Sequence, residues 1–275
     1  MELRKLLGIK SEIGNILDDF AATFEVVLVE NASVLSSYCT RIKEDALLIA
    51  ATDATIDLGK EYGIATMAYM NPEILNQNYS GVDMIVEGFE EVNANFLEKV
   101  WQRYHHLPWE IAKTKRCIIR ELTLDDLDAL FELYADEEIT KYTESLYPYE
   151  EEKEFQRAYI NNMYRFYGYG MWLIFSKETG ELIGRAGLEH REYNGELELE
   201  LGYVIGTKYQ RQGYATEVCL RILGIAREVT DFSKINCLIE EENKASVCLA
   251  EKLGFACEEI VDMQGKRMRK YVYIF

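Results

Sequence analysis

A short polar loop with one glycine has the residue types and spacing needed to hold a phosphate group. Its residues are Gln210, Arg211, Gln212, Gly213, Tyr214 and Ala215. The loop follows a strand-like run, residues 199–205, and precedes an amphipathic helical stretch that reaches about residue 228. A helix start offers free backbone N–H groups and the positive end of the helix dipole. Because Gly213 lacks a Cβ, a bulky ligand can approach the backbone closely, and Ala215 keeps the next turn equally shallow. The loop therefore predicts an anion site.

Three further patterns lie at fixed distances from this loop. An acid-bearing strand, Glu200–Ile205, precedes it, an Asn243-x-x-Ser246 box follows it, and Leu253-Gly254-Phe255 lies beyond. With these patterns, the chain from about Arg116 to Phe275 resembles the GNAT family of acyl-CoA N-acyltransferases, in particular its RimJ/RimL-like branch. Gln-x-x-Gly-x-Ala is the pyrophosphate loop of that family, and it is matched here without a gap.

The resemblance implies an N-acetyltransferase that uses acetyl-CoA as co-substrate and a primary amine, on a small molecule or a protein N-terminus, as acceptor. The amine attacks the thioester directly in a ternary complex, and the enzyme positions the reactants, removes a proton and stabilises the oxyanion. The backbone N–H groups of residues 211–215 would surround the pyrophosphate. Arg211 either adds a charge-assisted contact or remains a solvated loop side chain.

The strand before the loop carries the expected catalytic residues, Glu200 and Tyr203. By resemblance, Glu200 is a general base that acts through water, although a solvent-facing strand would show the same alternation of Glu and Leu. The same resemblance assigns Tyr203, Val204 and Ile205 to the pantetheine arm, with the N–H of Tyr203 or Val204 near the thioester carbonyl.

The Asn-x-x-Ser box is expected to contact the pantetheine and adenosine side of the ligand through Asn243 and Ser246. Asn243 is also a favoured helix N-cap, and both roles can hold together. Many family members have a tyrosine seven residues after this asparagine that is proposed to protonate the leaving thiolate, but this chain has Ala250. Tyr203, Tyr214, Ser246 or water would then serve as the acid. The alternative is a non-catalytic acyl-CoA-binding sensor or interaction protein.

The acceptor side is expected to be aromatic, with tyrosines that either bind a cation by their ring faces or pack between helices. These tyrosines are Tyr142, Tyr147, Tyr149, Tyr164, Tyr167 and Tyr169. The net charge of −18 argues against nucleic acid as a partner and is compatible with a cationic acceptor, although solubility alone explains it too.

The first portion of the chain alternates apolar strands with helical patterns, which indicates a small Rossmann-like parallel α/β domain. Strands are expected at Glu25–Glu30, Asp45–Ala50, Ile64–Tyr69 and Val82–Val86, and helices at about 34–43, 54–62 and 90–104. Around Leu48–Thr52 and Lys60–Ile64 this portion resembles the core of haloacid dehalogenase-like phosphatases.

In this second resemblance, the catalytic acids of the phosphatase family are missing. Ala51 stands at the position of the metal-binding acid, and the nearest echo of the Asp-x-Asp-Gly-Thr nucleophile motif, Val29–Ser33, lacks both aspartates. Because phosphoryl transfer by that route needs an Asp nucleophile and a carboxylate-held magnesium, the portion is expected to be non-catalytic. A role in protein interaction, such as forming a homodimer, stays open.

The complete chain is therefore expected to be α/β, with a degenerate domain at 1–112 followed by a GNAT fold, a mixed sheet flanked by helices, at 113–275. In the second domain, strands are expected at 117–121, 171–176, 182–192, 196–205, 234–239, 256–262 and 268–274, and helices at 124–136, 150–164, 214–229 and 244–252. Six scattered cysteines indicate free thiols of a cytoplasmic protein. No histidine spacing suits a metal, and no apolar run suits a membrane.

Overall fold

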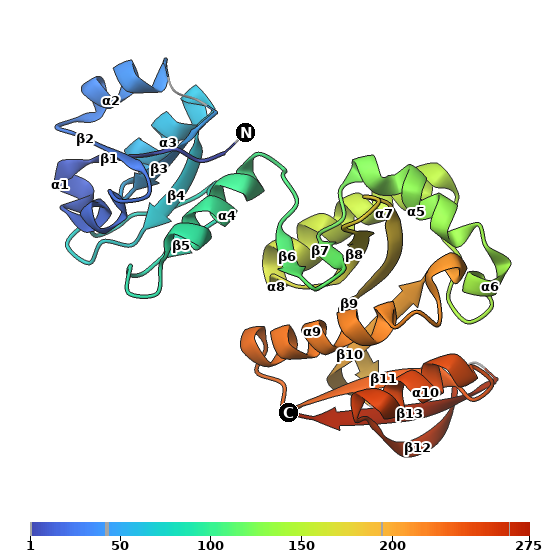
Figure 1. Ribbon diagram of the computed structural model, residues 1–275. Coiled ribbons are helices and arrows are strands. Elements are labelled where there is room, and N and C mark those ends of the chain that lie inside the picture. Colours follow the sequence, from blue (N-terminus) through green and yellow to red (C-terminus); the bar gives the residue numbers. More distant parts are fainter. Residues whose placement is uncertain (1, 42–43, 194, 264) are drawn as a thin grey trace. The chain divides into compact units, whose positions relative to one another are not determined.

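The computed structural model describes residues 2–41, 44–193, 195–263 and 265–275, and the chain divides into two compact units, Met1–Trp109 and Glu110–Phe275 (Figure 1). Each unit has its own sheet and its own hydrophobic core. Among the described residues, no helix is long and apolar enough to cross a bilayer.

The first unit contains a five-stranded sheet in the order β2-β1-β3-β4-β5, and every pair is parallel. Its strands are β1 Lys5–Ile9, β2 Glu25–Val29, β3 Ala46–Ala50, β4 Ala65–Tyr69 and β5 Ile85–Val86. Its longer helices are α2 Ala32–Cys39, α3 Asp53–Tyr62 and α4 Ala94–Tyr104, and the shorter α1 Lys10–Ile13 and η1 Ile16–Phe20 follow β1. Strand β1 was not expected from the sequence, and the expected end of the helix at 34–43 reaches residues 42–43, outside the described part of the chain.

Burial on both faces explains why β3 is a continuous apolar run. Leu47 and Ile49 pack into one cluster with Trp101 of α4. Leu48 and Ala50 face the other side, where they join a cluster that contains Ile56 of α3. Alternate residues of one strand therefore enter separate cores, as a parallel sheet covered on both faces requires.

Polar side chains of the first unit close the carboxyl ends of its central strands. The buried carboxylate of Glu12, just after β1, accepts hydrogen bonds from Ala51 N–H (3.1 Å), Thr52 Oγ1 (3.1 Å) and Thr55 Oγ1 (2.6 Å). Asn31, at the predicted remnant of the nucleophile motif, caps α2 by accepting from the N–H of Val34. Both groups thus have structural partners within this unit.

The second unit contains an eight-stranded mixed sheet in the order β12-β13-β11-β10-β9-β8-β7-β6. Its strands are β6 Glu110–Lys113, β7 Cys117–Arg120, β8 Met171–Ser176, β9 Leu182–Tyr193, β10 Glu196–Ile205, β11 Lys234–Glu240, β12 Ala256–Met263 and β13 Lys266–Ile274. The pairing of β10 with β11 is parallel, and the other neighbouring pairs are antiparallel.

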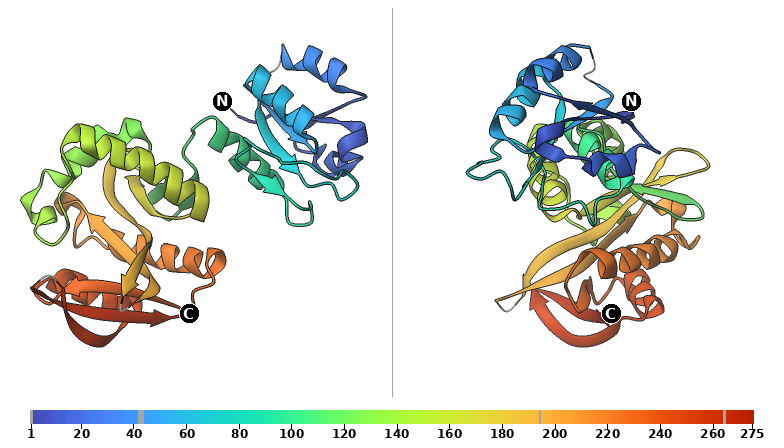
Figure 2. Two further views of the ribbon diagram at one scale, coloured as in Figure 1. Left: turned by 180° about the vertical axis from the view of Figure 1, so that it is seen from behind. Right: turned by 90° about the vertical axis from the view of Figure 1, so that its left-hand side faces the viewer.

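Helices cover both faces of this sheet (Figure 2). One face carries α5 Leu127–Tyr134 and α7 Tyr149–Tyr159, and the other carries α9 Tyr214–Val229 and α10 Lys244–Leu253. Short pieces complete the list: η2 Leu124–Asp126, α6 Glu137–Thr140, the π-helical η3 Ile160–Tyr164, α8 Arg165–Tyr167 and η4 Thr207–Tyr209.

Two predicted helices of the second unit are divided into shorter pieces in the structure. The expected helix at 124–136 is a 3-10 turn followed by α5, which ends at Tyr134. The expected helix at 150–164 begins at Tyr149, and a π-helical turn carries it on into α8, which ends at Tyr167. Glu150, Glu151 and Glu152 lie in its first turn, where carboxylates favour the positive end of the helix dipole.

Candidate active site

Strands β10 and β11 diverge in the middle of the sheet. Their parallel register contains a single pair, Glu200 with Asn236, whereas β10 stays paired with β9 as far as Ile205. Gly206, just after β10, donates its N–H to the C=O of Ile183 in β9. Along an antiparallel pair of strands, residues alternate between those that hydrogen-bond to the partner strand and those that do not. The N–H and C=O groups of Tyr203 and Ile205 therefore point away from β9, toward the gap, whereas those of Val204 point to β9. A flexible chain with amide groups can pair with such a strand edge.

The glycine-bearing loop turns the end of β10 into α9. Arg211 and Gly213 both have left-handed backbone conformations, with φ of 59° and 84°, and Gly213 is the N-cap of α9. At the start of α9, the N–H of Glu217 donates to the C=O of Gly213. The N–H groups of residues 214–216 precede this bond, have no partner within the helix and can bind a ligand. Residues 211–213 are exposed. The loop therefore presents donors and the helix dipole to solvent, which suits an anion.

The two glutamines of the loop hold its own backbone. Gln210 donates its side-chain N–H to Ile205 C=O at 3.0 Å, and Gln212 donates to Lys208 C=O at 2.8 Å. Their amide groups thus fix the turn, and the residues of this loop whose side chains are directed elsewhere are Arg211, Tyr214 and Ala215. The backbone N–H of Gln210 is also engaged, since it donates to Thr207 C=O.

Glu200 lies on β10 directly opposite Glu189 of β9, and Arg191 forms an ion pair with its carboxylate. The Glu200 side chain is 14% exposed. Burial raises the pKa of Glu200, and the negative charge of Glu189 adds to this effect, although the Arg191 charge opposes it. A carboxylate with a raised pKa is a better proton acceptor than an ordinary one. Glu200 belongs to the single pair of β10 with β11, so it lies directly before the point where the two strands diverge.

Sequence reasoning missed a buried ion cluster beside Glu200. Glu198, which is 7% exposed, accepts from Lys234 (2.9 Å), Lys270 (2.8 Å) and the side-chain amide of Asn236 (2.8 Å). Burial raises the pKa of Glu198, but the hydrogen bonds and charges of Lys234 and Lys270 together lower it by more. The pKa of Glu198 is therefore below its ordinary value. The cluster ties β10 to β11 and β13 just before the point of divergence.

The Asn-x-x-Ser box lies at the start of α10. Asn243 accepts the Ser246 N–H at 3.1 Å and so acts as the N-cap. Tyr203 donates its hydroxyl to Ser246 C=O at 3.2 Å, which links β10 to the same helix start. Burial raises the pKa of Tyr203 far above its ordinary value. Ala250 is fully buried and accepts from Gly254 N–H and Phe255 N–H, so it serves the helix end.

The predicted tyrosine cluster separates into buried and exposed members. Tyr164 is 1% exposed, and its hydroxyl bonds Met171 C=O, whereas Tyr169 contacts His190 at 2.8 Å. Tyr147, Tyr149 and Tyr167 are exposed. A further tyrosine, Tyr159 of α7, donates to Glu189 at 3.2 Å and accepts from Met171 N–H. Packing therefore explains the buried members of the predicted set.

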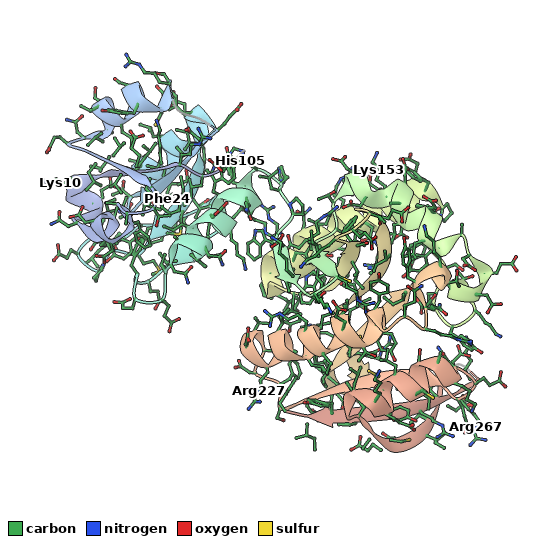
Figure 3. The ribbon with its side chains drawn as sticks, viewed as in Figure 1. Lys10, Phe24, His105, Lys153, Arg227 and Arg267 are labelled. Carbon is green, nitrogen blue, oxygen red and sulfur yellow. The ribbon has the colours of Figure 1, made fainter. Side chains whose placement is uncertain are left out.

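A polar interior lies between α7 and the sheet. Arg185 of β9 is 7% exposed, and its Nε finds no hydrogen-bond partner among the described residues, while Tyr134 and Tyr159 contribute phenol groups near its charge. Gln156 of α7 is fully buried and donates its side-chain N–H to Glu152 at 2.6 Å, whereas Figure 3 shows Lys153 of the same helix at the outer edge of the second unit. In the described part of the chain, no group of three or more His, Cys, Asp or Glu residues is placed to hold a metal ion.

Comparison with known proteins agrees with this geometry. Residues 116–256, about half of the chain, match the family model of the acetyltransferase (GNAT) domain. The uncharacterized protein YkkB of Bacillus subtilis is 30% identical over 168 residues, which cover 58% of this chain and 95% of that protein. The uncharacterized N-acetyltransferase YoaA of the same organism is 28% identical over 169 residues, 59% of this chain and 88% of YoaA.

Solved structures share the fold of the second unit. The ribosomal alpha-N-protein acetyltransferase RimL in complex with coenzyme A superposes with a TM-score of 0.51 at 18% identity, over 60% of this chain and 97% of that one. The expected α/β architecture with a mixed sheet is thus confirmed for this unit. With residues 116–256 matched to the family model, the chain belongs to the GNAT acetyltransferase family and is an acyltransferase.

Proposed function

We propose that the protein transfers an acetyl group from acetyl-CoA to a primary amine by direct attack in a ternary complex. The observation that carries the proposal is the loop 210–215, which turns through two left-handed residues into the N-terminus of α9 beside the divergence of β10 and β11. A pyrophosphate at the helix start and an amide-bearing pantetheine arm along β10 satisfy both features together. The RimL structure with a TM-score of 0.51 contains coenzyme A, which supports this choice of donor.

The residue roles follow from chemistry at each position. Backbone N–H groups of residues 211–215 surround the pyrophosphate, and Tyr203, with its N–H and C=O, and Ile205, with its N–H, pair with the pantetheine arm. Glu200 takes the proton of the ammonium through water, because its raised pKa makes it a competent base. Asn243 and Ser246 lie at the start of α10 and border the pantetheine side.

The acceptor is an amine with a positive charge before reaction. Two observations support a cationic acceptor: the net charge of −18, and the carboxylate of Glu189 on the sheet face that carries α7. Glu200 beside it is already paired with Arg191, whereas Glu189 accepts from the neutral hydroxyl of Tyr159 and so keeps its charge for an ammonium group. An ammonium group is attracted to such a face, and its loss of a proton there produces the nucleophile.

A second candidate, a non-catalytic acyl-CoA sensor, is favoured by one observation. Ala250, at the position of the usual tyrosine, is buried and has no proton to donate to the leaving thiolate. The hydroxyl of Tyr203 donates to Ser246 C=O, and burial raises its pKa, so it is a poor proton donor as well. If the thiolate leaves without a protein acid, water must protonate it. Turnover separates this candidate from the enzyme.

For the first unit we propose a degenerate, non-catalytic relative of haloacid dehalogenase-like phosphatases, with a domain boundary near residue 112 and a Rossmann-like arrangement. The support is the all-parallel sheet and the uncharged Ala51 at the carboxyl end of β3. The Glu12 carboxylate at that edge accepts three hydrogen bonds from residues of the same unit, which gives it a structural role there. We propose an interaction or stabilising role for this unit, with homodimer formation as one form.

The test is a thiol-release assay with acetyl-CoA and the full-length protein against polyamines, aminoglycosides, amino acids and peptides with free N-termini. The enzyme reading predicts release of coenzyme A with at least one acceptor class, well above the rate without amine. A Gly213→Asp variant, assayed in parallel, should lose this release. Saturable acetyl-CoA binding without release for any amine would establish the sensor instead.

A further inference from the structure

Arg116, the residue immediately before β7, joins the start of that strand to the phosphate loop far along the chain. Its backbone N–H and its Nε donate to the Glu217 carboxylate at 2.8 and 2.7 Å. Its Nη1 donates to Gln212 C=O at 3.0 Å, and its guanidinium lies 4.0 Å from the ring centre of Tyr214. One side chain thus contacts two consecutive segments, the exposed loop and the first turn of α9.

The electrostatics of this contact bear on the ligand. Glu217 lies in the first turn of α9, where an acid would oppose any anion at the same helix start. Arg116 pairs with that acid by two hydrogen bonds, and its cation offsets the carboxylate charge. The Arg116 side chain is 36% exposed and that of Glu217 is 19% exposed, so screening by water is incomplete.

The position is also sterically close to the proposed pyrophosphate. A Cβ added at Gly213 would lie 3.5 Å from Nη2 of Arg116. The guanidinium therefore lies next to the glycine whose backbone a ligand can approach most closely. The backbone of Arg116 is fixed from the other side, because its C=O accepts the Lys177 N–H. The guanidinium is therefore held in place before any ligand arrives.

We propose that Arg116 is a positioning residue for acyl-CoA binding, which holds the phosphate loop on the first turn of α9 and cancels the charge of Glu217 there. The inference rests on the proposed function, since it assumes a pyrophosphate at this loop. It predicts that the Glu217 carboxylate is harmful to binding when Arg116 is absent, and that the two substitutions partly compensate.

The experiment is calorimetry of coenzyme A binding to four full-length proteins: wild type, Arg116→Met, Glu217→Gln and the double variant. Because an unpaired carboxylate at the start of α9 repels the phosphate charges, Arg116→Met should weaken binding about fivefold to tenfold, which corresponds to about 1.0–1.4 kcal/mol. Glu217→Gln should bind as tightly as wild type or more tightly. The double variant should recover most of the affinity lost in Arg116→Met.

The matched control is Arg120→Met, four residues further along the same segment. Arg120 also forms an ion pair, with Asp126 at 2.6 Å, and also stacks on a ring, that of Phe175 at 4.2 Å. It makes none of the contacts described for the loop, so this variant should keep wild-type affinity. Pantetheine, which lacks the pyrophosphate, should bind wild type and Arg116→Met equally in ligand-observed NMR.

The outcomes separate the inference from the function on which it rests. Failure of wild type to bind coenzyme A would remove the proposed function itself. Wild-type binding with unchanged affinity in Arg116→Met, or a double variant as weak as Arg116→Met, would overturn the role of Arg116. If Arg116→Met fails to fold, Glu217→Gln decides, because weaker binding in that variant contradicts the charge argument.

Discussion

Replacing Gly213 by Asp tests the phosphate loop with a built-in control, Gly213→Asn. Gly213 has φ +84°, a conformation that Asn and Asp adopt more readily than other side chains, at a cost of about 1 kcal/mol. The nearest atom to the new Cβ, Nη2 of Arg116 at 3.5 Å, is at ordinary contact distance, so both variants should fold. They share shape and strain and differ in charge.

The magnitude follows from the charges. A carboxylate about 5 Å from a phosphate charge is repelled by about 0.8 kcal/mol even at the dielectric constant of water, and a pyrophosphate has two such charges. The repulsion is therefore about 1.4 kcal/mol or more, which is about tenfold in affinity. Gly213→Asp should bind coenzyme A more than tenfold more weakly than wild type, with Gly213→Asn between the two.

The assay is isothermal calorimetry with coenzyme A on proteins whose fold is verified by circular dichroism and thermal melting. Raising the salt concentration should narrow the difference between the Asp and Asn variants, because screening weakens charge repulsion. Unchanged affinity in a folded Gly213→Asp variant would refute the assignment of the loop.

Four further predictions concern the base, its ion pair with Arg191, the ion cluster and the first unit. Glu200→Gln should keep coenzyme A affinity and lower kcat/KM, with the larger loss at neutral pH, where most of the amine is protonated; equal rates across the pH range would show that the base lies elsewhere. Arg191→Met removes a charge that lowers the pKa of Glu200, so the acid limb of the pH–rate profile should move to higher pH, and an unmoved limb would contradict the pairing. Glu198→Gln removes the carboxylate nearest to the buried Lys270, at 2.8 Å, and leaves it the more distant Glu258 at 3.7 Å and Glu259 at 3.9 Å, so the variant should be less stable by about 2 kcal/mol in denaturant melts. Because the pKa of Glu198 is lowered in the folded state, wild type should lose this advantage as pH falls through that pKa, and the variant's stability should depend less on pH. The full-length protein with magnesium should not hydrolyse generic phosphate monoesters. Robust hydrolysis would contradict the interpretation that Ala51 replaces the metal-binding acid and makes the first unit non-catalytic.

The elements around the candidate site were predictable because their signals are local. The expected bounds of β8, β10 and α9 coincide with the observed ones, since strand alternation, the loop glycine and the helical period occur within a few residues of each other. Strand β1 was missed because five residues, Lys5–Ile9, form too short a run to distinguish from a helix start. Strand β6 was missed because its pairing with β7 is a property of the folded sheet.

The contacts that shape the site depend on residues far apart in the sequence. Alternation places Glu198 on the same face as Glu200, but the burial of Glu198 comes from Lys270 on β13, 72 positions away. The Arg116–Glu217 pair spans 101 positions. Such pairs follow from sheet order, which a single sequence does not reveal.

The most direct measurement of the central claim is mass spectrometry of both substrates and of the protein after incubation with acetyl-CoA and an acceptor amine from the screen. Direct transfer predicts equal amounts of acetylated amine and free coenzyme A, with an unmodified enzyme, and little product from the Gly213→Asp variant. Tight binding of acetyl-CoA without an acetylated amine in any acceptor class would contradict the account.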